Sequence, residues 1–460
     1  MFKKITFLFI AVFLVFNSAA SFAEEKSSSR SVSEKNIVNI EFTALLIVAS
    51  PDGKHVAYVT YADNKQFVIV DGKEGKHYDG IGSNMTFSPD SKHLLYGAQT
   101  GDKQVVVVDG EEGKHYDSIG SNLIFSPDSK RVAYSAKMQS KCFVVVDGQE
   151  GKNYEGIGSN LVFSPDGKHV AYGVKSENKE FVVVDGKEGK RYDGISPAIA
   201  FSPDSMSLAY WAQSGKKRLV VVNEKEEKQY DDIRPVFVFS PDSKHLAYVA
   251  QEGNKLFTVV DGKEGKRYDG VGSNIVFSPD SRLVVYGALL ENKRFVVVNG
   301  QEGKLYNGMG PTLIFSPDGK HMAYWAQLEN KRFVVIDGKE EKKYDNIGNG
   351  SLAFSPDSKH LAYGAQSGNK RFVVVDGKEE KQYDSISTLL VYSPNSKHLA
   401  YVGQSDNKQF AVIDSKEENK YDGVLTMGKE RIVFDSEDRL HYLVMKDKKI
   451  YFVDVKINAN

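Results

Sequence analysis

A Ser-Pro-Asp motif, or a close variant of it, recurs through almost the whole chain. The interval between successive copies is 38 residues at every step but one, where it is 39. The prolines of the motif are Pro51, Pro89, Pro127, Pro165, Pro203, Pro241, Pro279, Pro317, Pro356 and Pro394. A fixed period in this range is typical of a solenoid, a propeller or an array of small units, so the repeat constrains the fold more than any single residue does.

One unit, residues 122–158, indicates which architecture applies. Its turn chemistry is explicit, because Ser-Pro-Asp-Ser favours a type I turn and Asp-Gly favours a tight hairpin turn. No unit contains ten residues with a helical period, which excludes a helical repeat. Four short antiparallel strands in each unit make one propeller blade. The strands expected in this unit are Leu123–Phe125, Arg131–Ala136, Phe143–Val146 and a more polar one beginning at Asn153–Glu155.

Both ends of the array suggest that a ring closes. Residues 431–434, 440–445 and 450–455 predict the first three strands of an eleventh, degenerate unit. Val38–Phe42 lies one period before residues 76–80, so we expect it to supply the missing fourth strand, with Ile40 in the column of Tyr78. The fold class expected is all-β: a β-propeller of four-stranded antiparallel blades, about 38 residues per blade, with 10–11 blades. A single ring is favoured by the uniform register, and two successive rings are the alternative.

The N-terminus predicts export. Lys3 and Lys4 precede the apolar run Ile5–Phe16, and small residues follow at Ser21 and Ala23, as in a secretory signal peptide. A run of 12 residues is too short to span a bilayer as a helix. The expected division is a signal peptide at 1–23, a flexible polar leader at 24–36 and the propeller array at 37–456. We expect a bacterial periplasmic or extracellular protein without stable membrane insertion after signal cleavage.

Composition excludes other classes. The formal net charge is −1, with 60 basic and 61 acidic side chains scattered along the chain, so nucleic acid is not an expected partner. The single cysteine, Cys142, allows no internal disulfide, and the sequence assigns it no role.

The blade unit resembles the WD40-like, PD40-type repeats of the periplasmic TolB propeller and of the prolyl oligopeptidase family. The residues that carry the resemblance are Phe125-Ser126-Pro127-Asp128 with Arg131-Val132-Ala133-Tyr134, repeated at 239–242 with 245–248. It covers nearly all of the expected mature chain and implies a propeller fold, whereas such blades serve many functions. TolB-like proteins carry a separate N-terminal α/β domain and the peptidases carry a hydrolase domain. The sequence matches neither addition, which speaks against both activities.

The periodic residues favour structural roles. Two tyrosine columns, one running from Tyr58 to Tyr442 and one from Tyr78 to Tyr421, are expected to form the packing between blades. Seven histidines share a third column, His55, His93, His169, His245, His321, His360 and His398. Equivalent atoms of neighbouring blades lie about 10 Å apart, so this column cannot converge on one metal ion. We expect no catalytic residues, no cofactor and no metal site.

Positions where the repeat fails to repeat remain as candidates for function. The loop from strand four to the next strand one commonly contains Gly-Ser-Asn, but two successive loops carry Ser196-Pro197 and Arg234-Pro235 instead. The only tryptophans, Trp211 and Trp325, lie in the same neighbourhoods. In propellers these loops and those between strands two and three share one face. The partner-contact residues expected from this reasoning are Ser196, Trp211, Gln213, Arg234 and Trp325, with drift among duplicated repeats as the alternative explanation.

The function expected from these features is a non-enzymatic binding or scaffold module that presents a propeller face to a protein or another envelope component. The first alternative is a hydrolase or lyase with its site in the central channel, for which no metal or acid–base cluster is found in the sequence. The second alternative is a structural envelope protein.

Overall fold

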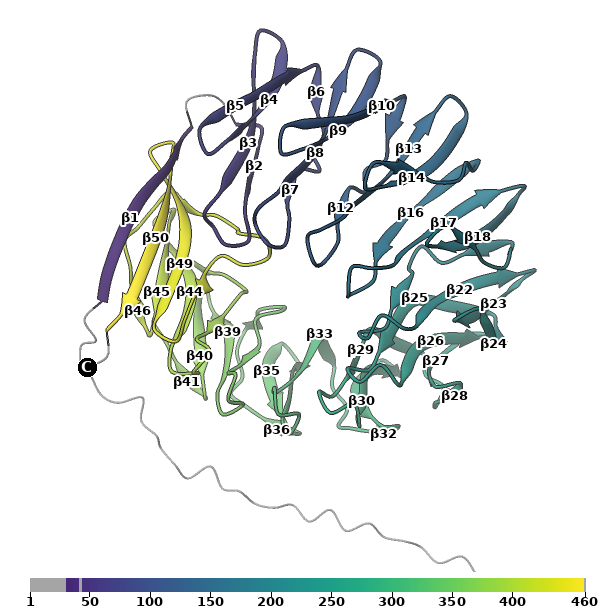
Figure 1. The fold of residues 1–460 in the computed structure, drawn as a ribbon. Coiled ribbons are helices and arrows are strands. Elements are labelled where there is room, and N and C mark those ends of the chain that lie inside the picture. Colours follow the sequence, from purple (N-terminus) through teal and green to yellow (C-terminus); the bar gives the residue numbers. More distant parts are fainter. Residues whose placement is uncertain (1–29, 41–43, 459–460) are drawn as a thin grey trace, which may run out of the picture.

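Every repeat folds into a small antiparallel sheet in the computed structural model, which describes residues 30–40 and 44–458 (Figure 1). The hairpin turns determine the pairing. Asp147 and Gly148 both have positive φ, at 52° and 78°, and Glu177 and Asn178 have φ of 52° and 57°. Two consecutive residues with positive φ form the type I′ turn, whose twist matches that of the strands it joins. The hairpins predicted at Asp-Gly are therefore confirmed.

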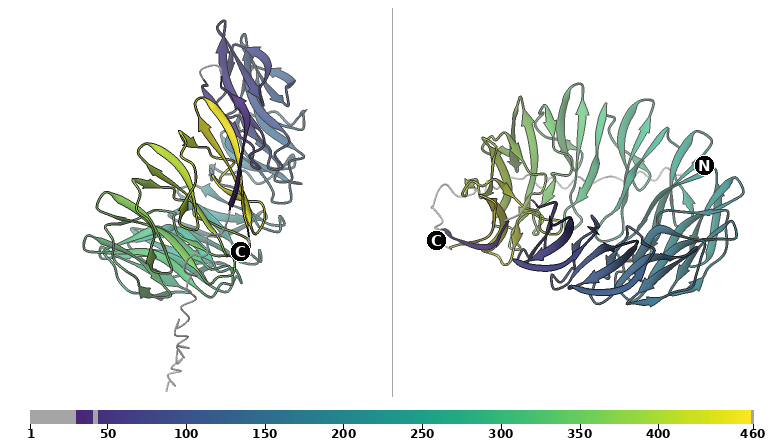
Figure 2. Two further views of the ribbon diagram at one scale, coloured as in Figure 1. Left: turned by 90° about the vertical axis from the view of Figure 1, so that its left-hand side faces the viewer. Right: turned by 90° about the horizontal axis from the view of Figure 1, so that it is seen from above.

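The described residues form eleven sheets, arranged around one ring (Figures 1 and 2). Each sheet is ordered from a first strand near the centre of the ring to a fourth strand at its rim (Figure 1). We number the blades one to eleven by the chain order of their second strands.

The first strand is continuous in five blades and broken into two pieces in six. The continuous ones are β2 (Leu46–Ala49), β16 (Gly156–Phe163), β25 (Asp232–Phe239), β29 (Gly270–Phe277) and β33 (Gly308–Phe315). The broken ones are β6 (Gly80–Ile81) with β7 (Thr86–Phe87), β11 (Ser118–Ile119) with β12 (Ile124–Phe125), β20 (Gly194–Ile195) with β21 (Ala200–Phe201), β37 (Asn346–Ile347) with β38 (Ala353–Phe354), β42 (Ser385–Ile386) with β43 (Val391–Tyr392), and β47 (Gly423–Val424) with β48 (Val433–Phe434).

The second and third strands form the regular hairpin of each blade. The second strands are β3 (Val56–Ala62), β8 (Leu94–Thr100), β13 (Val132–Met138), β17 (Val170–Ser176), β22 (Leu208–Ser214), β26 (Leu246–Glu252), β30 (Val284–Leu290), β34 (Met322–Leu328), β39 (Leu361–Ser367), β44 (Leu399–Ser405) and β49 (Arg439–Lys446). The third strands are β4 (Lys65–Val70), β9 (Lys103–Val108), β14 (Lys141–Val146), β18 (Lys179–Val184), β23 (Lys217–Val222), β27 (Lys255–Val260), β31 (Lys293–Val298), β35 (Lys331–Ile336), β40 (Lys370–Val375), β45 (Lys408–Ile413) and β50 (Lys449–Ile457).

The fourth strands are mostly short. They are β5 (Lys73–Tyr78), β10 (Glu111–Tyr116), β15 (Gln149–Glu150), β19 (Lys187–Glu188), β24 (Lys225–Tyr230), β28 (Lys263–Glu264), β32 (Gln301–Glu302), β36 (Lys339–Glu340), β41 (Lys378–Glu379), β46 (Lys416–Glu417) and, for blade eleven, β1 (Arg30–Asn39). In the unit 122–158 this strand begins at Gln149 rather than at the expected Asn153. The type I′ turn brings Gln149 opposite Val146 at once, and pairing resumes at Tyr154 opposite Cys142.

The core lies between neighbouring blades. Tyr116 and Tyr134, one from each tyrosine column, are 1% and 4% exposed and meet edge to face at 6.3 Å. The two columns are therefore packing residues, as predicted. No helix among the described residues is long and apolar enough to cross a membrane.

The two ends of the described chain close the ring. Strand β1 pairs antiparallel with β50, from Arg30 opposite Ile457 to Asn39 opposite Lys449. Val38, rather than the expected Ile40, occupies the tyrosine column, because Val38 lies opposite Ile450. The strand expected at 38–42 thus begins at Arg30, inside the segment expected to be leader. Residues 41–43 and the expected signal peptide lie outside the described residues.

Two parts of the expected fold class are corrected. The array contains eleven blades in a single ring, which replaces the estimate of 10–11 blades and rules out two successive rings. The blades are also not uniform 38-residue units, since the eleventh joins β1 to strands almost 400 positions later. The physical reason is one shared core, in which Val38 and Leu440 of blade eleven pack with Val56 of blade one and Ala400 of blade ten.

Candidate binding site on the innermost strands

The repeated polar residues contact one another and connect the blades. All seven histidines of the predicted column place Nδ1 within 2.6–2.8 Å of an aspartate at the turn between the third and fourth strands of the same blade, as in His93 with Asp109. At the rim, nine lysines bind glutamates of the following blade at 2.5–2.7 Å, as in Lys152 with Glu188. The histidine column therefore acts within each blade, and the lysine column connects neighbouring blades.

The Ser-Pro-Asp turns form a second set of connections. The Ser88 hydroxyl donates to Asp90 at 2.6 Å, and the backbone N–H of Asp90 donates to the hydroxyl of Ser129 in the next blade at 2.9 Å. The Ser88 hydrogen bond, opposed by desolvation, lowers the pKa of Asp90 to about 2. The motif that defines the repeat is therefore also a contact between blades.

The Gly-Ser-Asn segments lie in the innermost layer of the ring. Residues 158–160 and 272–274 are part of the continuous strands β16 and β29, whereas residues 82–84 and 120–122 form the loops between β6 and β7 and between β11 and β12. Asn274 lies within β29 and donates to the carbonyl oxygen of Pro311 in the next blade at 2.8 Å, and Asn122 donates to that of Leu161 at 3.2 Å. The backbone bulges between Val271 and Ile275, which lets the segment follow the inner edge of the sheet. Departures from the repeat at these positions therefore alter the surface that faces the centre of the ring.

The five predicted contact residues fall into two groups. Ser196 is buried, and its backbone N–H donates to the carbonyl oxygen of Trp211 at 2.8 Å. Trp211 and Trp325 are 7% and 6% exposed and pack against the following blade, so they are core residues. Gln213 is half-buried and donates to the carbonyl oxygen of Gly215 at 3.0 Å. Only Arg234, on β25, is exposed to solvent.

Both tryptophans stack under an arginine of the neighbouring strand. The Arg218 guanidinium lies 4.1 Å from the centre of the Trp211 ring and also binds the carboxylate of Asp232 in the next blade. Arg332 lies 4.4 Å from Trp325 and binds the side-chain oxygen of Asn346. Each arginine is thereby held between an indole and an oxygen acceptor. Sequence reasoning noticed the tryptophans but missed these arginines, although the column that holds them is regular.

A cavity of about 520 Å³ opens between the innermost strands of blades seven and eight. One wall is β29 with Gly287, Ala288 and Leu289 of β30, and the other is β33 with Tyr324 and Trp325 of β34. The indole of Trp325 lies directly over Gly310, where a Cβ atom would overlap it. Burial raises the pKa of the Tyr324 hydroxyl above its ordinary value, so this group is neutral at physiological pH. Among the described residues, Arg294 is the only charged one that lines the cavity.

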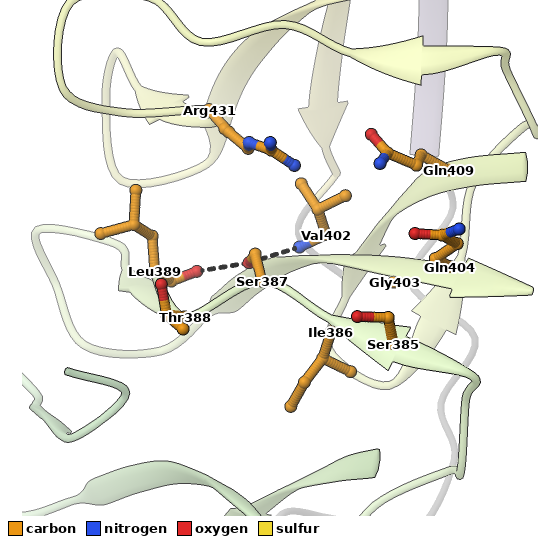
Figure 3. A pocket seen from close by; sticks show the side chains of 10 residues that line it. All are labelled: Ser385, Ile386, Ser387, Thr388, Leu389, Val402, Gly403, Gln404, Gln409 and Arg431. Atoms are coloured by element: carbon orange, nitrogen blue, oxygen red, sulfur yellow. Dashed lines mark hydrogen bonds between the residues drawn. The ribbon is translucent and has the colours of Figure 1, made fainter. Parts of the chain in front are cut away.

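A second cavity of about 320 Å³ lies at the equivalent place between blades ten and eleven. Figure 3 shows Arg431 extending over Val402 toward Gln409, with Ser387 hydrogen-bonded to Val402 and Leu389 below. Its walls carry hydroxyl and amide groups from Ser385, Thr388 and Gln404, and the described residues again contribute one arginine and no carboxylate. Sequence reasoning missed both cavities, because small residues at single positions of two different blades give no local motif.

The described residues contain no group of three or more His, Cys, Asp and Glu side chains that could hold a metal ion. Cys142 is half-buried and free.

Comparison with known proteins gives similarities of fold. No protein-family model matches the chain, and no curated protein matches it in sequence. Among solved structures, the Myceliophteria thermophila Cps50 (Swd1) β-propeller domain is 12% identical, with a TM-score of 0.27 over 56% of this chain and 96% of that one. The Dos1 propeller is 14% identical, with a TM-score of 0.31 over 64% and 91%. The β-propeller domain of the trilobed protease from Pyrococcus furiosus is 13% identical, with a TM-score of 0.27 over 58% and 98%.

The sheets and their circular order define this chain as a β-propeller. More particularly, its described residues form a propeller with eleven blades in one ring, whose last blade is completed by the strand β1.

Proposed function

We propose that this protein is an exported, non-enzymatic binding module that uses the innermost strands of its ring to hold a protein or another envelope component. The observation that carries the proposal is the location of the residues that differ from the repeat. Residues shared by the blades form most of the core and the connections between blades, whereas Ser196 and Arg234 depart from the repeat in the innermost layer and Trp211 and Trp325 are buried beside it. Two cavities open there, beside Arg294 and Arg431, and Arg234 is exposed on the same layer.

Rigidity supports this assignment. Hydrogen bonds from turn to turn, as from Asp90 to Ser129, and ion pairs at the rim hold each blade to the next. A surface fixed in this way loses little conformational entropy on binding. The resemblance of the repeats to the periplasmic TolB propeller and the signal-like N-terminus support an envelope location, which cell fractionation would test.

Crosslinking in intact cells tests the binding role. A photo-crosslinking amino acid at Arg234 on the inner strand β25 should give one dominant adduct, whereas the same residue at Lys225, exposed on the rim strand β24, should not. When the probe is moved to Pro235, the substitution Arg234→Gly should weaken the adduct, because it removes the exposed side chain that contacts the partner. The fold should tolerate this substitution, since most blades have glycine at the equivalent position. Equal, diffuse adducts from both positions would contradict the proposal and favour a structural role.

The enzyme alternative has its own test. Purified protein should turn over no substrate in a panel for hydrolases and lyases. Turnover together with a stoichiometric metal would replace the binding module by an enzyme.

A further inference from the structure

The arginines that occupy one column of the third strand are partnered in three blades. Arg218 binds Asp232, Arg332 binds Asn346, and Arg371 donates to the hydroxyl of Ser385 at 3.2 Å. In each case the acceptor stands at the start of the next blade's innermost strand. Where glutamine replaces arginine, as at Gln409, its side-chain oxygen accepts from the backbone N–H of Val424 in the same region at 2.9 Å. The column therefore normally joins two blades.

Arg294, in blade seven, is the exception. The acceptor position of the next blade is Gly308, which has no side chain, and the position of the stacking tryptophan is Gly287. Within residues 30–40 and 44–458, the Arg294 guanidinium has no hydrogen-bonding, ion-pairing or ring partner. Two glycines thus remove both groups that hold Arg218 in blade five, and the cavity of about 520 Å³ lies at this place.

The walls of this cavity combine one positive charge with apolar surface. Val271, Leu289, Met309, Leu313 and Trp325 supply side chains, and glycines expose backbone. No aspartate or glutamate of the part of the chain that the structure describes lines it. The volume lies within the range of roughly 300–1,000 Å³ that is usual for small-molecule sites. An anion that is also apolar would suit these walls, because an unpaired guanidinium favours a carboxylate in bidentate geometry.

We propose that the cavity between blades seven and eight binds a small aromatic carboxylate, whose carboxylate pairs with Arg294 and whose ring lies beside Gly287. This inference rests on the proposed binding function. Blades five and six give the internal precedent, since there Arg218 contacts an indole and a carboxylate, Trp211 and Asp232, at once. Met309 reaches toward Gly287, and its flexible side chain can move to admit a ring.

Isothermal titration calorimetry on the full chain tests the ligand class with three probes. Indole-3-acetate carries a ring and a charge, indole-3-ethanol carries the ring alone, and acetate carries the charge alone. We expect indole-3-acetate to bind at least about tenfold more tightly than either of the others, the difference that one charge-assisted hydrogen-bonded pair supplies. Equal binding of indole-3-acetate and indole-3-ethanol, or no binding of indole-3-acetate at about 1 mM, would overturn the proposal.

Three variants locate the site. Arg294→Gln should weaken the binding of indole-3-acetate about tenfold or more, because it removes the positive charge. The variant should remain folded, since Gln66, Gln104 and Gln409 occupy equivalent positions in other blades. Gly308→Asp supplies the carboxylate that Asp232 gives Arg218 and should weaken binding similarly, once Gln327 shifts to make room. Lys293→Gln, which removes the neighbouring charge outside the cavity, is the control and should change affinity less than about twofold.

Unchanged affinity in Arg294→Gln, with circular dichroism showing a folded ring, would place the probe elsewhere and refute the site. A dominant crosslink at Arg234 combined with failure of all three probes would refute the ligand class alone and leave the binding module standing. Selective binding of indole-3-acetate without a dominant crosslink at Arg234 would refute the proposed binding module and leave the ligand class of this cavity standing.

Discussion

The hydroxyl of Tyr421 donates a 2.6 Å hydrogen bond to the carboxylate of Glu34, a residue 387 positions earlier in the chain. Burial, and then this hydrogen bond, raise the pKa of Tyr421 above its ordinary value, so the hydroxyl stays protonated. Glu34 stands where blades two to ten have the glutamate that binds a rim lysine, and Asn419 also donates to it at 3.0 Å. Closure of the ring therefore repeats the contact that Tyr192 makes with Glu226 of the next blade, at 2.9 Å.

Removal of Arg30 should open this closure. Its guanidinium binds Glu418 at 2.8 Å and the carbonyl oxygen of Ile413 at 2.6 Å, and the Arg30 and Glu418 side chains are only 8% and 11% exposed. Because Arg30→Ala leaves a buried charge unpaired, we expect the free energy of unfolding to fall by about 3 kcal/mol in urea denaturation.

The matched control is Lys152→Ala, which breaks the exposed rim pair with Glu188 and should cost less than about 1 kcal/mol. Similar losses in the two variants would contradict a special role for the closure.

Ser129→Gly should weaken the contact between blades two and three. The Ser129 hydroxyl accepts the backbone N–H of Asp90 at 2.9 Å, and the substitution removes that acceptor. The φ of 63° at Ser129 suits glycine, so backbone strain does not add to the loss. We expect destabilisation of about 1 kcal/mol in the same denaturation assay. Gly167, the equivalent residue one blade later, shows that the turn itself tolerates glycine. Complete unfolding of the Ser129→Gly variant would argue against a local effect.

Acid should loosen the turns over a defined range of pH. Hydrogen bonds from Ser88 and Ser316 lower the pKa values of Asp90 and Asp318 to about 2, below the value of about 3.9 in an unfolded chain. A carboxylate whose pKa is lowered by folding stabilises the protein fully at pH values above its pKa in the unfolded chain. This contribution disappears as the pH falls through the pKa of the folded state. The melting temperature should therefore fall between about pH 4 and pH 2.

The double variant Asp90→Asn, Asp318→Asn should show a shallower fall over this range. The chain offers the precedent at Asn395, which accepts from the Ser393 hydroxyl at 2.7 Å and from the backbone N–H of Lys397 at 3.1 Å without a titrating group. An unchanged slope would mean that other carboxylates control acid unfolding.

Gly310→Ala should destabilise blade eight. A Cβ atom at this position would overlap the indole of Trp325, which is fixed by Arg332 and by a 3.2 Å hydrogen bond to Asn349. We expect a loss of about 1–3 kcal/mol, as for other overpacked cores. Gly272→Ala is the control, because the nearest atom to its Cβ would be the Gly287 carbonyl oxygen at 3.5 Å, an ordinary contact. Equal tolerance of both substitutions would show that the indole moves freely.

The sequence predicted the repeated parts of this protein well. Ser-Pro-Asp turns, Asp-Gly hairpins and the tyrosine columns are set by local chemistry or by periodic packing, so ten copies of one pattern reinforce each prediction. The histidine column also proved structural, since His93 and its equivalents each face an aspartate of their own blade. The candidate site was predicted less well, because Trp211 and Trp325 were recognised as departures but their burial was not.

The sequence by itself determined the blade: its strands, its turns and the residues that face its neighbours, all of which depend on contacts within one or two repeats. Only the tertiary structure decided the number of blades in the ring, the register of β1 and the position of the cavities. Ring closure depends on how the small angles between eleven blades add up, and no local pattern encodes that sum. That Arg294 lacks a side-chain partner among the described residues likewise became visible only beside Gly308 of the next blade, which has no side chain.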